Sequence, residues 1–398
     1  MQRRQFLKTL PPALTLPVLT ACQSSPANAV RITALKGTFP ALLTQQFKKA
    51  NPQANPIDLT QERQLRVLFQ QLQAWKRQSF PNYAPKKGLV PINLPFIGTT
   101  PEIPIADLTT LSDFWLTPAI RQSLIQPIDP REIPQFSTLD STLQALLKRN
   151  DSGALDPTGQ LWGIPYRINS TVILYRKDQF KDHNLTPPTD WADLWRSDLT
   201  GKISLLDSPI EVIGLTLKKL GKSYNELTLP TALSTELAQL HAQVKLYSST
   251  HYLQPLTLDH TWVALASSTD ALRMIRRNPT LAAVFPRSGT LLSADLWVQP
   301  ANQAADSTQA TLVTHQATLA AWCNYCLTPE LAPQLSQLTQ GIAPNLSQTP
   351  ELNRPEDLRA NPILSPSSEA FKRSEYLTPK SDTQLAQWRS AWEQMRKI

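Results

Sequence analysis

The fold is decided by LWGIPYRINSTVILYRKDQF at residues 161–180 and PPTDWADLWRSDLTGKISLLDSPIEVIGLTLKKLG at 187–221. The hydrophobic pattern of this stretch predicts a strand at 171–176, a proline-rich turn at 186–188, a helix at 190–196, a strand at 202–206 and a helix at 209–220. Strands that alternate with helices are typical of α/β folds with doubly wound sheets. In such folds ligands bind beyond the carboxyl ends of strands, where helices begin.

The same alternation is predicted on both sides of this stretch. The pattern predicts strands at 30–35, 105–111 and 262–266, and helices at 39–50, 62–78 and 317–327, with a further helix that ends at Arg277. A proline-rich stretch at 80–104 predicts an extended surface loop that is inserted between these elements. Elements of both kinds in both halves predict two doubly wound α/β lobes, which also suits the length of the chain.

The N-terminus carries an export pattern. Arg3-Arg4-Gln5-Phe6-Leu7-Lys8 matches a twin-arginine signal, and Leu19-Thr20-Ala21-Cys22 resembles the lipobox of bacterial lipoproteins. A transmembrane anchor is the alternative, but residues 9–21 are too few to span a bilayer and contain three prolines. We therefore expect a signal peptide at 1–21, lipidation of Cys22, a tether at 22–29, and a location in the periplasm or on the outer face of the cytoplasmic membrane.

Composition excludes several function classes. Cleavage before Cys22 removes 21 of 398 residues and three basic side chains, so the net charge falls from +8 to +5, and no long basic run remains to bind nucleic acid. The 11 glycines include no G-x-G pair and no G-x-S-x-G elbow, and no two of the 5 histidines are four residues apart. We expect no enzyme activity, no cofactor and no metal site.

Two cysteines remain in the mature chain, in the stretch Trp322-Cys323-Asn324-Tyr325-Cys326. A C-x-x-C pair is found in redox and metal sites, but a thioredoxin-like pair opens a helix and a four-cysteine metal site needs a second pair. Here both cysteines lie inside an apolar helical stretch. We interpret them as buried thiols that pack as small apolar residues.

The stretch 161–226 resembles the spermidine/putrescine-binding branch of the solute-binding proteins of ABC transporters. Weaker similarities follow in the family's order at 105–129, 318–335 and 341–346. The resemblance implies the two-lobed periplasmic-binding fold of type II, with mixed sheets and a ligand cleft between the lobes. It assigns residues 30–165 and about 291–345 to lobe 1, and 166–290 and about 346–398 to lobe 2.

The resemblance also implies a ligand site. It places carboxylates for an amine at Glu211 and Asp295, a serine and an aromatic ring at Ser112 and Phe114, and a further acidic position at Asp207 or Ser208. Most of the family's aromatic positions hold other residues here, namely Leu35 to Thr38, Ser267, Ser293 and Ile342. The resemblance therefore implies the scaffold more strongly than the polyamine cage.

Several of these residues have a second interpretation. The guanidinium of Arg167 would repel a polyamine and attract an anion, or it would form a structural ion pair between the lobes. Glu211 also suits a helix start, where the helix dipole favours a carboxylate, and Asp295 also suits an ordinary turn. We interpret Asp113 and Asp270 as helix-start residues.

We expect a monomeric, lipid-tethered solute-binding protein that captures a small cationic or zwitterionic solute, such as a polyamine, and delivers it to an ABC permease. The alternative is a lipoprotein that keeps the fold but serves assembly or signalling, as the missing rings and the proline-rich insertion suggest. A ferric-ion-binding relative would need adjacent tyrosines, and none of the 8 tyrosines are adjacent.

Overall fold

A computed structural model describes residues 28–79, 104–301 and 309–397. The predicted signal peptide, Cys22 and nearly all of the proline-rich stretch at 80–104 lie outside the described residues. Within the described part of the chain, no helix is both long enough and apolar enough to cross a bilayer.

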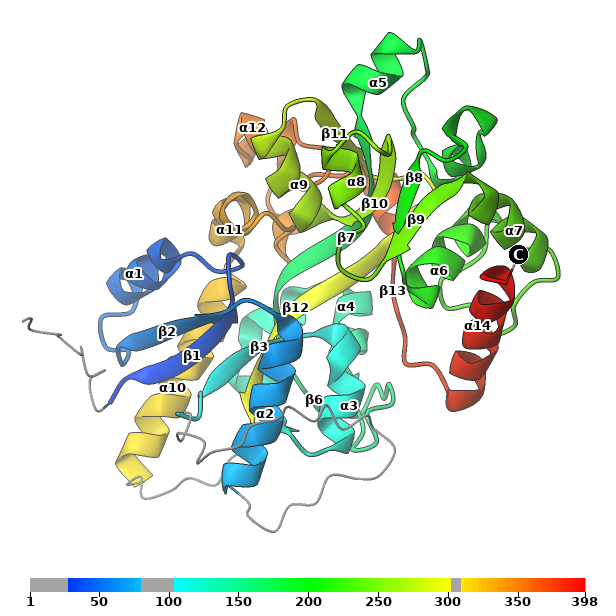
Figure 1. Ribbon diagram of the computed structural model, residues 1–398. Coiled ribbons are helices and arrows are strands. Elements are labelled where there is room, and N and C mark those ends of the chain that lie inside the picture. The colour runs from blue at the N-terminus through cyan, green and yellow to red at the C-terminus, as the bar shows by residue number, and fades with distance from the viewer. Residues whose placement is uncertain (1–27, 80–103, 302–308, 398) are drawn as a thin grey trace, which may run out of the picture.

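One mixed sheet runs through the whole molecule. Its strands follow the order β2 (Ile57–Glu62), β1 (Val30–Leu35), β3 (Leu108–Ser112), β12 (Leu291–Pro300), β7 (Ile164–Arg176), β10 (Val263–Ser267), β8 (Ile203–Leu206) and β9 (Val244–Ser248). Strands β2, β1 and β3 are parallel to one another, and so are β10, β8 and β9. The long strands β7 and β12 pair antiparallel between these two blocks, and in Figure 1 they run diagonally from one half to the other.

Shorter strands complete the sheets. Strand β11 (Leu281–Val284) pairs with β7, whereas β4 (Ile125–Gln126) and β13 (Glu375–Tyr376) pair with β12. Strands β5 (Lys148–Arg149) and β6 (Gln160–Leu161) form a separate pair.

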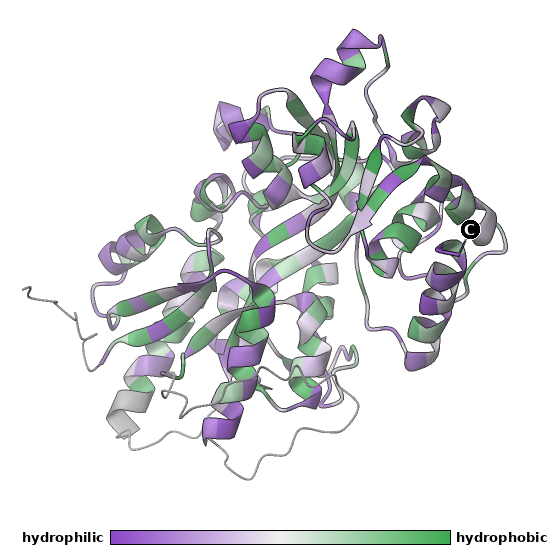
Figure 2. Ribbon diagram, viewed as in Figure 1, coloured by the Kyte–Doolittle hydropathy of each residue, from purple (hydrophilic) through white to green (hydrophobic). Residues whose placement is uncertain are grey.

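Helices surround the two halves. They are α1 (Ala41–Ala50), α2 (Leu65–Ser79), α3 (Leu116–Arg121), α4 (Ser141–Leu147), α5 (Lys177–Asp182), α6 (Pro209–Lys219), α7 (Leu233–Gln243), α8 (Gln254–Thr257), α9 (Ser268–Arg277), α10 (Gln309–Cys326), α11 (Ala332–Thr339), α12 (Glu356–Arg359), α13 (Ser368–Lys372) and α14 (Asp382–Met395). Figure 2 shows hydrophobic and hydrophilic residues side by side along helices such as α2 and α14, as expected for helices with one face on a core.

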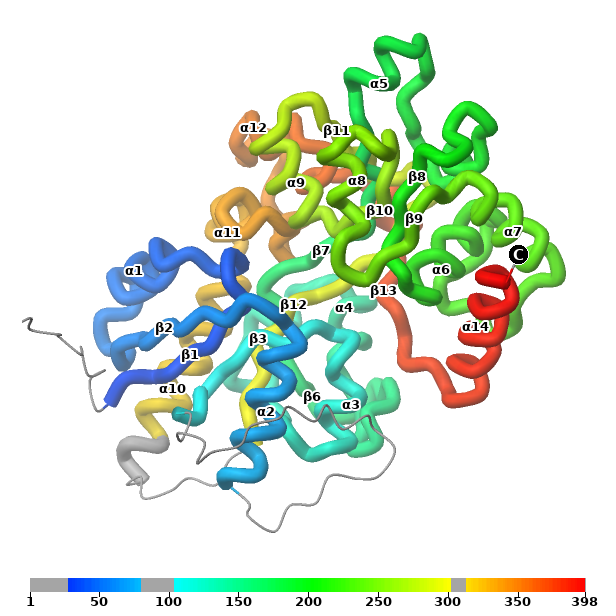
Figure 3. The backbone as a smooth tube through the Cα atoms, in the orientation of Figure 1, coloured from blue at the N-terminus to red at the C-terminus, as the bar shows by residue number. Residues whose placement is uncertain are grey.

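The buried apolar residues form two hydrophobic clusters. The larger one contains a group of aromatic rings, among them Phe39, Tyr166, Trp297 and Trp322. The second lies between β8, β10, α6 and α7, and the C-terminal helix α14 completes it with buried Trp388 and Trp392. Figure 3 shows how the chain returns from β13 to place α14 beside α6 and α7.

Cys323 and Cys326 are free cysteines in the larger cluster, on the buried face of α10. Burial raises the pKa of the Cys323 thiol to about 12, so this group stays protonated at neutral pH. Buried thiols packed among apolar residues agree with the interpretation of this pair from the sequence.

The predicted elements are largely present, but several differ in extent or type, and others, among them α4, α7, α14 and β9, have no counterpart in the prediction. The sequence reading missed strand β2, whose last residue Glu62 was assigned to the following helix, and that helix begins at Leu65. Helix 190–196 is a short 3₁₀ helix, η4 (Trp191–Trp195). Strand 171–176 is the second half of β7, which begins at Ile164. Its first half carries Arg167, Asn169 and Ser170, and these polar residues hide the apolar pattern of a strand.

Candidate ligand-binding site

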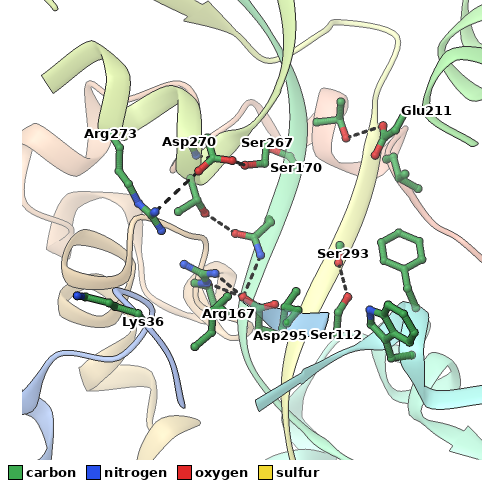
Figure 4. A pocket seen from close by; sticks show the side chains of 18 of the residues that line it. Lys36, Ser112, Arg167, Ser170, Glu211, Ser267, Asp270, Arg273, Ser293 and Asp295 are labelled. Carbon is green, nitrogen blue, oxygen red and sulfur yellow. Dashed lines mark hydrogen bonds and ion pairs between the residues drawn. The ribbon is translucent and has the colours of Figure 1, made fainter. Parts of the chain in front are cut away.

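A cavity of about 420 Å³ opens where the two blocks of the sheet meet. Its walls come from β3, β7 and β12, from the starts of α6 and α9, and from the turn after β1. Figure 4 shows the side chains that line it. Six of the residues expected from the sequence lie here together: Ser112, Phe114, Arg167, Glu211, Ser267 and Asp295.

Glu211 lies in the first turn of α6, which begins with Pro209 after the N-cap residue Ser208. The hydroxyl of Thr171 donates a hydrogen bond to its Oε2 at 3.1 Å, and no cation in the described part of the chain pairs with it. Burial raises the pKa of Glu211 to about 7, although the hydrogen bond from Thr171 acts in the opposite direction. This carboxylate is therefore available to a cationic ligand.

Asp295 is differently placed because Arg167 occupies its carboxylate. Nε of Arg167 donates to Oδ2 of Asp295 at 2.8 Å, Nη2 forms an ion pair with the same oxygen, and Asn169 donates to it at 3.1 Å. Both side chains of the ion pair are only 3% exposed, and Nη1 of Arg167 donates to the carbonyl oxygen of Thr339. Of the two interpretations of Arg167, the structure favours the buried ion pair.

The backbone at Gly341 passes close to the side-chain stem of Arg167. A Cβ atom on Gly341 would lie 2.3 Å from Cγ of Arg167, so only glycine leaves room for the arginine stem at this position. Asp295 lines the cavity, but its Oδ2 already accepts hydrogen bonds from Arg167 and Asn169. Glu211 is consequently the better candidate for an amine ligand.

Asp113 begins the 3₁₀ helix η1 (Asp113–Trp115), as expected of a helix-start residue, but its carboxylate also holds β12. Its Oδ1 accepts hydrogen bonds from the hydroxyl of Ser293 at 2.9 Å and from the amide of Ala294 at 3.1 Å. Burial raises the pKa of Asp113 to about 6, and these hydrogen bonds lower it only in part. The network fixes Ser112 and Ser293 at 3.1 Å from each other in the cavity wall.

Helix α9 begins at the cavity, with Ser267 as its N-cap. Oγ of Ser267 accepts a hydrogen bond from the amide of Asp270 at 3.2 Å and donates to its Oδ2 at 2.9 Å. Asp270 is therefore a helix-start residue, as interpreted from the sequence. Thr269 donates to Oδ1 of Asn169 at 2.6 Å and so connects α9 to the network around Asp295.

Asp207 and Ser208 are not brought to the cavity. Asp207 is exposed at the end of β8, and Ser208 caps α6 from outside the lining. Eight other polar or aromatic residues line the cavity without having been predicted from the sequence: Lys36, Arg63, Trp115, Asn169, Ser170, Thr171, Thr269 and Arg273. Arg273 lies one helical turn after Asp270, so the spacing could have indicated that both residues face the same side of α9. No sequence pattern near Arg63 indicates that it lines the cavity.

Comparison with known protein families shows the family to which the chain belongs. The sequence profile described as "Bacterial extracellular solute-binding protein" matches residues 103–364, well over half of the chain. The chain belongs to this family. Strands β3, β7 and β12 and both helix starts at the cavity fall within the matched residues.

Individual relatives agree with this assignment. The spermidine/putrescine-binding periplasmic protein of Escherichia coli K12 is 25% identical over 273 residues, which cover 68% of this chain and 72% of that protein. The putrescine/cadaverine-binding protein of Pseudomonas aeruginosa PAO1 is 26% identical over 172 residues, 39% of this chain and 48% of that protein.

Solved structures show the fold. A spermidine/putrescine substrate-binding protein of an ABC transporter from Streptococcus pneumoniae superposes with a TM-score of 0.70 at 19% identity, covering 93% of this chain and 98% of that one. A cyclic alpha-maltosyl-1,6-maltose binding protein from Arthrobacter globiformis superposes with a TM-score of 0.64 at 12% identity, and the superposition covers 93% of this chain and 94% of that one. The expected fold, a two-lobed periplasmic-binding fold of type II, is confirmed.

Proposed function

We propose that this protein captures a small amine-bearing solute in the cavity between its lobes and delivers it to the permease of an ABC importer. The observation that carries the proposal is Glu211, a partly buried carboxylate without a cationic partner in the described part of the chain. Phe114 and Trp115 line the same cavity and offer rings for a cation or for methylene groups. Relatives whose names include spermidine, putrescine and cadaverine support an amine as the ligand.

Spermidine itself is expected to bind weakly. Each cation–π contact contributes roughly 0.5–2 kcal/mol, and several ring positions of the polyamine-binding branch hold Ser267, Ser293 and Ile342 here. The alternative, a lipoprotein that keeps the fold without a transport role, is less well supported, because the cavity retains an unpaired carboxylate that a purely structural protein has no need to keep partly buried.

Substitution of Glu211 tests this function. We expect Glu211→Gln to weaken putrescine and spermidine binding by about 10- to 100-fold, the value of a charge-assisted hydrogen bond, as measured by isothermal titration calorimetry at pH 8. Asp207→Asn is the matched control, because it removes an exposed carboxylate four residues earlier that does not line the cavity. Unchanged binding in Glu211→Gln would exclude this site, and nanomolar spermidine binding would contradict the argument from the missing rings.

We further propose that the mature protein is anchored by lipid at Cys22 after twin-arginine export. The support is the sequence pattern alone, since these residues lie outside the described part of the chain. Cys22→Ser is expected to move the protein from the membrane pellet to the soluble fraction of fractionated cells. Replacing Arg3 and Arg4 by lysine is expected to leave the precursor uncleaved, and a variant that still pellets after Cys22→Ser would disprove lipid anchoring.

A further inference from the structure

The charge of the cavity does not match a ligand that is only cationic. Its lining contains four basic residues, Lys36, Arg63, Arg167 and Arg273, and three acidic residues, Glu211, Asp270 and Asp295. Arg167 and Asp295 neutralise each other in the buried ion pair. Three basic and two acidic side chains remain to meet a ligand, so a polycation would enter a cavity with an excess of positive charge.

The basic side chains gather at one end, where the two halves of the molecule approach each other. Arg273 extends from α9 toward the turn after β1, and its Nη2 lies 3.7 Å from the position that a Cβ atom of Gly37 would take. Lys36 precedes that glycine, and its amide donates to the carbonyl oxygen of Glu62, the residue before Arg63. Basic residues from both halves therefore line this part of the cavity.

Little negative charge balances this part of the cavity. Asp270 lies 3.8 Å from Nη1 of Arg273, at the outer limit of an ion pair, and its Oδ2 already accepts a hydrogen bond from Ser267. The carboxylate of Glu62 bonds the amide of Arg63 and does not line the cavity. Within the described residues no ion pair involves Lys36 or Arg63.

Glu211 lies on the other side of the cavity. Figure 4 shows it apart from Arg273 and Lys36, with the strands β7 and β12 between them. On the floor of the cavity, Ser170 is buried, and its Oγ has no hydrogen-bond partner among the described residues. Because this hydroxyl lies in the cavity wall, it is open to a hydrogen bond with a polar group of a ligand.

We propose that the ligand is amphoteric, with an amine held at Glu211 and an acidic group, such as a carboxylate, held at Arg273 and Lys36 on the other side of the cavity. This inference rests on the proposed function and narrows the ligand class of the same site. It explains why the cavity combines a carboxylate without a cationic partner with more basic side chains than its remaining acidic side chains can neutralise.

Two series of matched probes test this proposal. The first contains 1,5-diaminopentane, 5-aminopentanoate and glutarate, and the second contains 1,8-diaminooctane, 8-aminooctanoate and suberate. Within each series only the end groups differ. We expect calorimetry at pH 8 to show that the amino acid of at least one length binds about 10-fold or more tightly than the diamine and the diacid of that length.

Substitution of Arg273 gives a second, independent measurement. Arg273→Gln is expected to weaken binding of the amino acid by about 10- to 100-fold and to strengthen binding of the diamine, because a repulsive charge is removed. Arg276→Gln is the matched control, since Arg276 is exposed on the same helix and does not line the cavity. Thermal denaturation of each variant confirms that it is folded.

The outcomes separate this proposal from the proposed function. If the diamine binds more tightly than the amino acid, and Glu211→Gln abolishes that binding, the ligand is a plain amine and only the amphoteric assignment is overturned. If Arg273→Gln weakens the diamine and the amino acid equally, the assignment of the acidic end is overturned. If no probe binds at either length, both proposals fail.

Discussion

At the scale of single residues, two opposing effects act on the charge of Glu211. Its place in the first turn of α6 favours a carboxylate through the helix dipole, whereas burial disfavours the charged form and raises its pKa to about 7. A carboxyl group with this pKa changes its charge near neutral pH. We therefore expect the binding of an amine at Glu211 to be coupled to the release of a proton.

The pH dependence of binding follows from this pKa. Below about pH 7 Glu211 is protonated and loses its attraction for an amine, so the affinity for putrescine is expected to rise roughly 10-fold or more between pH 5.5 and 8.5. Calorimetry at pH 6 in two buffers of different ionisation enthalpy should show release of one proton on binding. A pH profile that is the same in Glu211→Gln as in the natural protein would contradict this assignment.

The stability of the free protein should change in the opposite direction. A folded-state pKa above the usual value of 4.5 means that the folded protein holds this proton more tightly than the unfolded chain does. The contribution of Glu211 to the free energy of unfolding therefore falls as pH rises from about 4.5 to about 7. Glu211→Gln is expected to raise that free energy by about 1–2 kcal/mol at pH 8, as measured by urea denaturation.

At the scale of elements, the ion pair between Arg167 and Asp295 connects β7 and β12, the two strands that both halves share. Each charge is buried and depends on the other, because a lone buried charge is strongly unfavourable. The pair also keeps Asp295 from acting as a free carboxylate in the cavity. We therefore expect the pair to position the strands that line the cavity.

Substitutions of the pair are expected to be non-additive. Asp295→Asn alone should lower the free energy of unfolding by about 3–5 kcal/mol, because Arg167 remains buried without its partner. The double variant Arg167→Met with Asp295→Leu should recover most of this loss, since two apolar side chains replace two charges of similar volume. Urea denaturation of Arg167→Met, Asp295→Leu and the double variant measures the coupling.

Ligand binding by the folded double variant gives a further criterion. If the pair only positions the strands, the double variant should bind an amine probe within a few-fold of the natural protein. A complete loss of binding in a stable double variant would restore Asp295 to the ligand-contacting role that the family resemblance implies.

At the scale of the whole molecule, two hydrophobic clusters share one continuous sheet. Cys323 and Cys326 belong to the first cluster, and Trp388 and Trp392 of α14 belong to the second. Strands β7 and β12 pair along their length between the two blocks of strands, so one half cannot lose its strands without exposing those of the other. We expect the halves to unfold together.

Substitution in one cluster and measurement in the other tests this coupling. Trp392→Ala removes a buried ring from the second cluster and is expected to cost roughly 3 kcal/mol. Two urea concentrations are compared: the one at which Cys323 and Cys326 become accessible to a thiol reagent, and the unfolding midpoint measured by circular dichroism. We expect Trp392→Ala to lower both by the same amount. Gln387→Ala, an exposed position on the same helix, is the control. Unchanged thiol protection in Trp392→Ala would show that the halves unfold independently.

The sequence by itself determined the fold class and the family, and it predicted Glu211, which the structure places in the cavity wall. Period-two and helical patterns are local, so strand β1 and the elements around 202–220 could be predicted where apolar residues recur regularly. Glu211 could be predicted because its helix start and its family motif lie within a few residues of each other. Strand β2 was missed because its side chains are half-buried or exposed and leave no clear apolar pattern.

Only the tertiary structure decided what the other polar residues do. Arg167 and Asp295 are 128 residues apart, and the sequence could not show that the antiparallel pairing of β7 and β12 places them in one ion pair. The basic part of the cavity, lined by Lys36, Arg63 and Arg273, likewise depends on two halves meeting across the cavity. Charges act through space rather than along the chain, so the charge balance of the cavity, on which the proposed ligand class rests, follows from the folded arrangement.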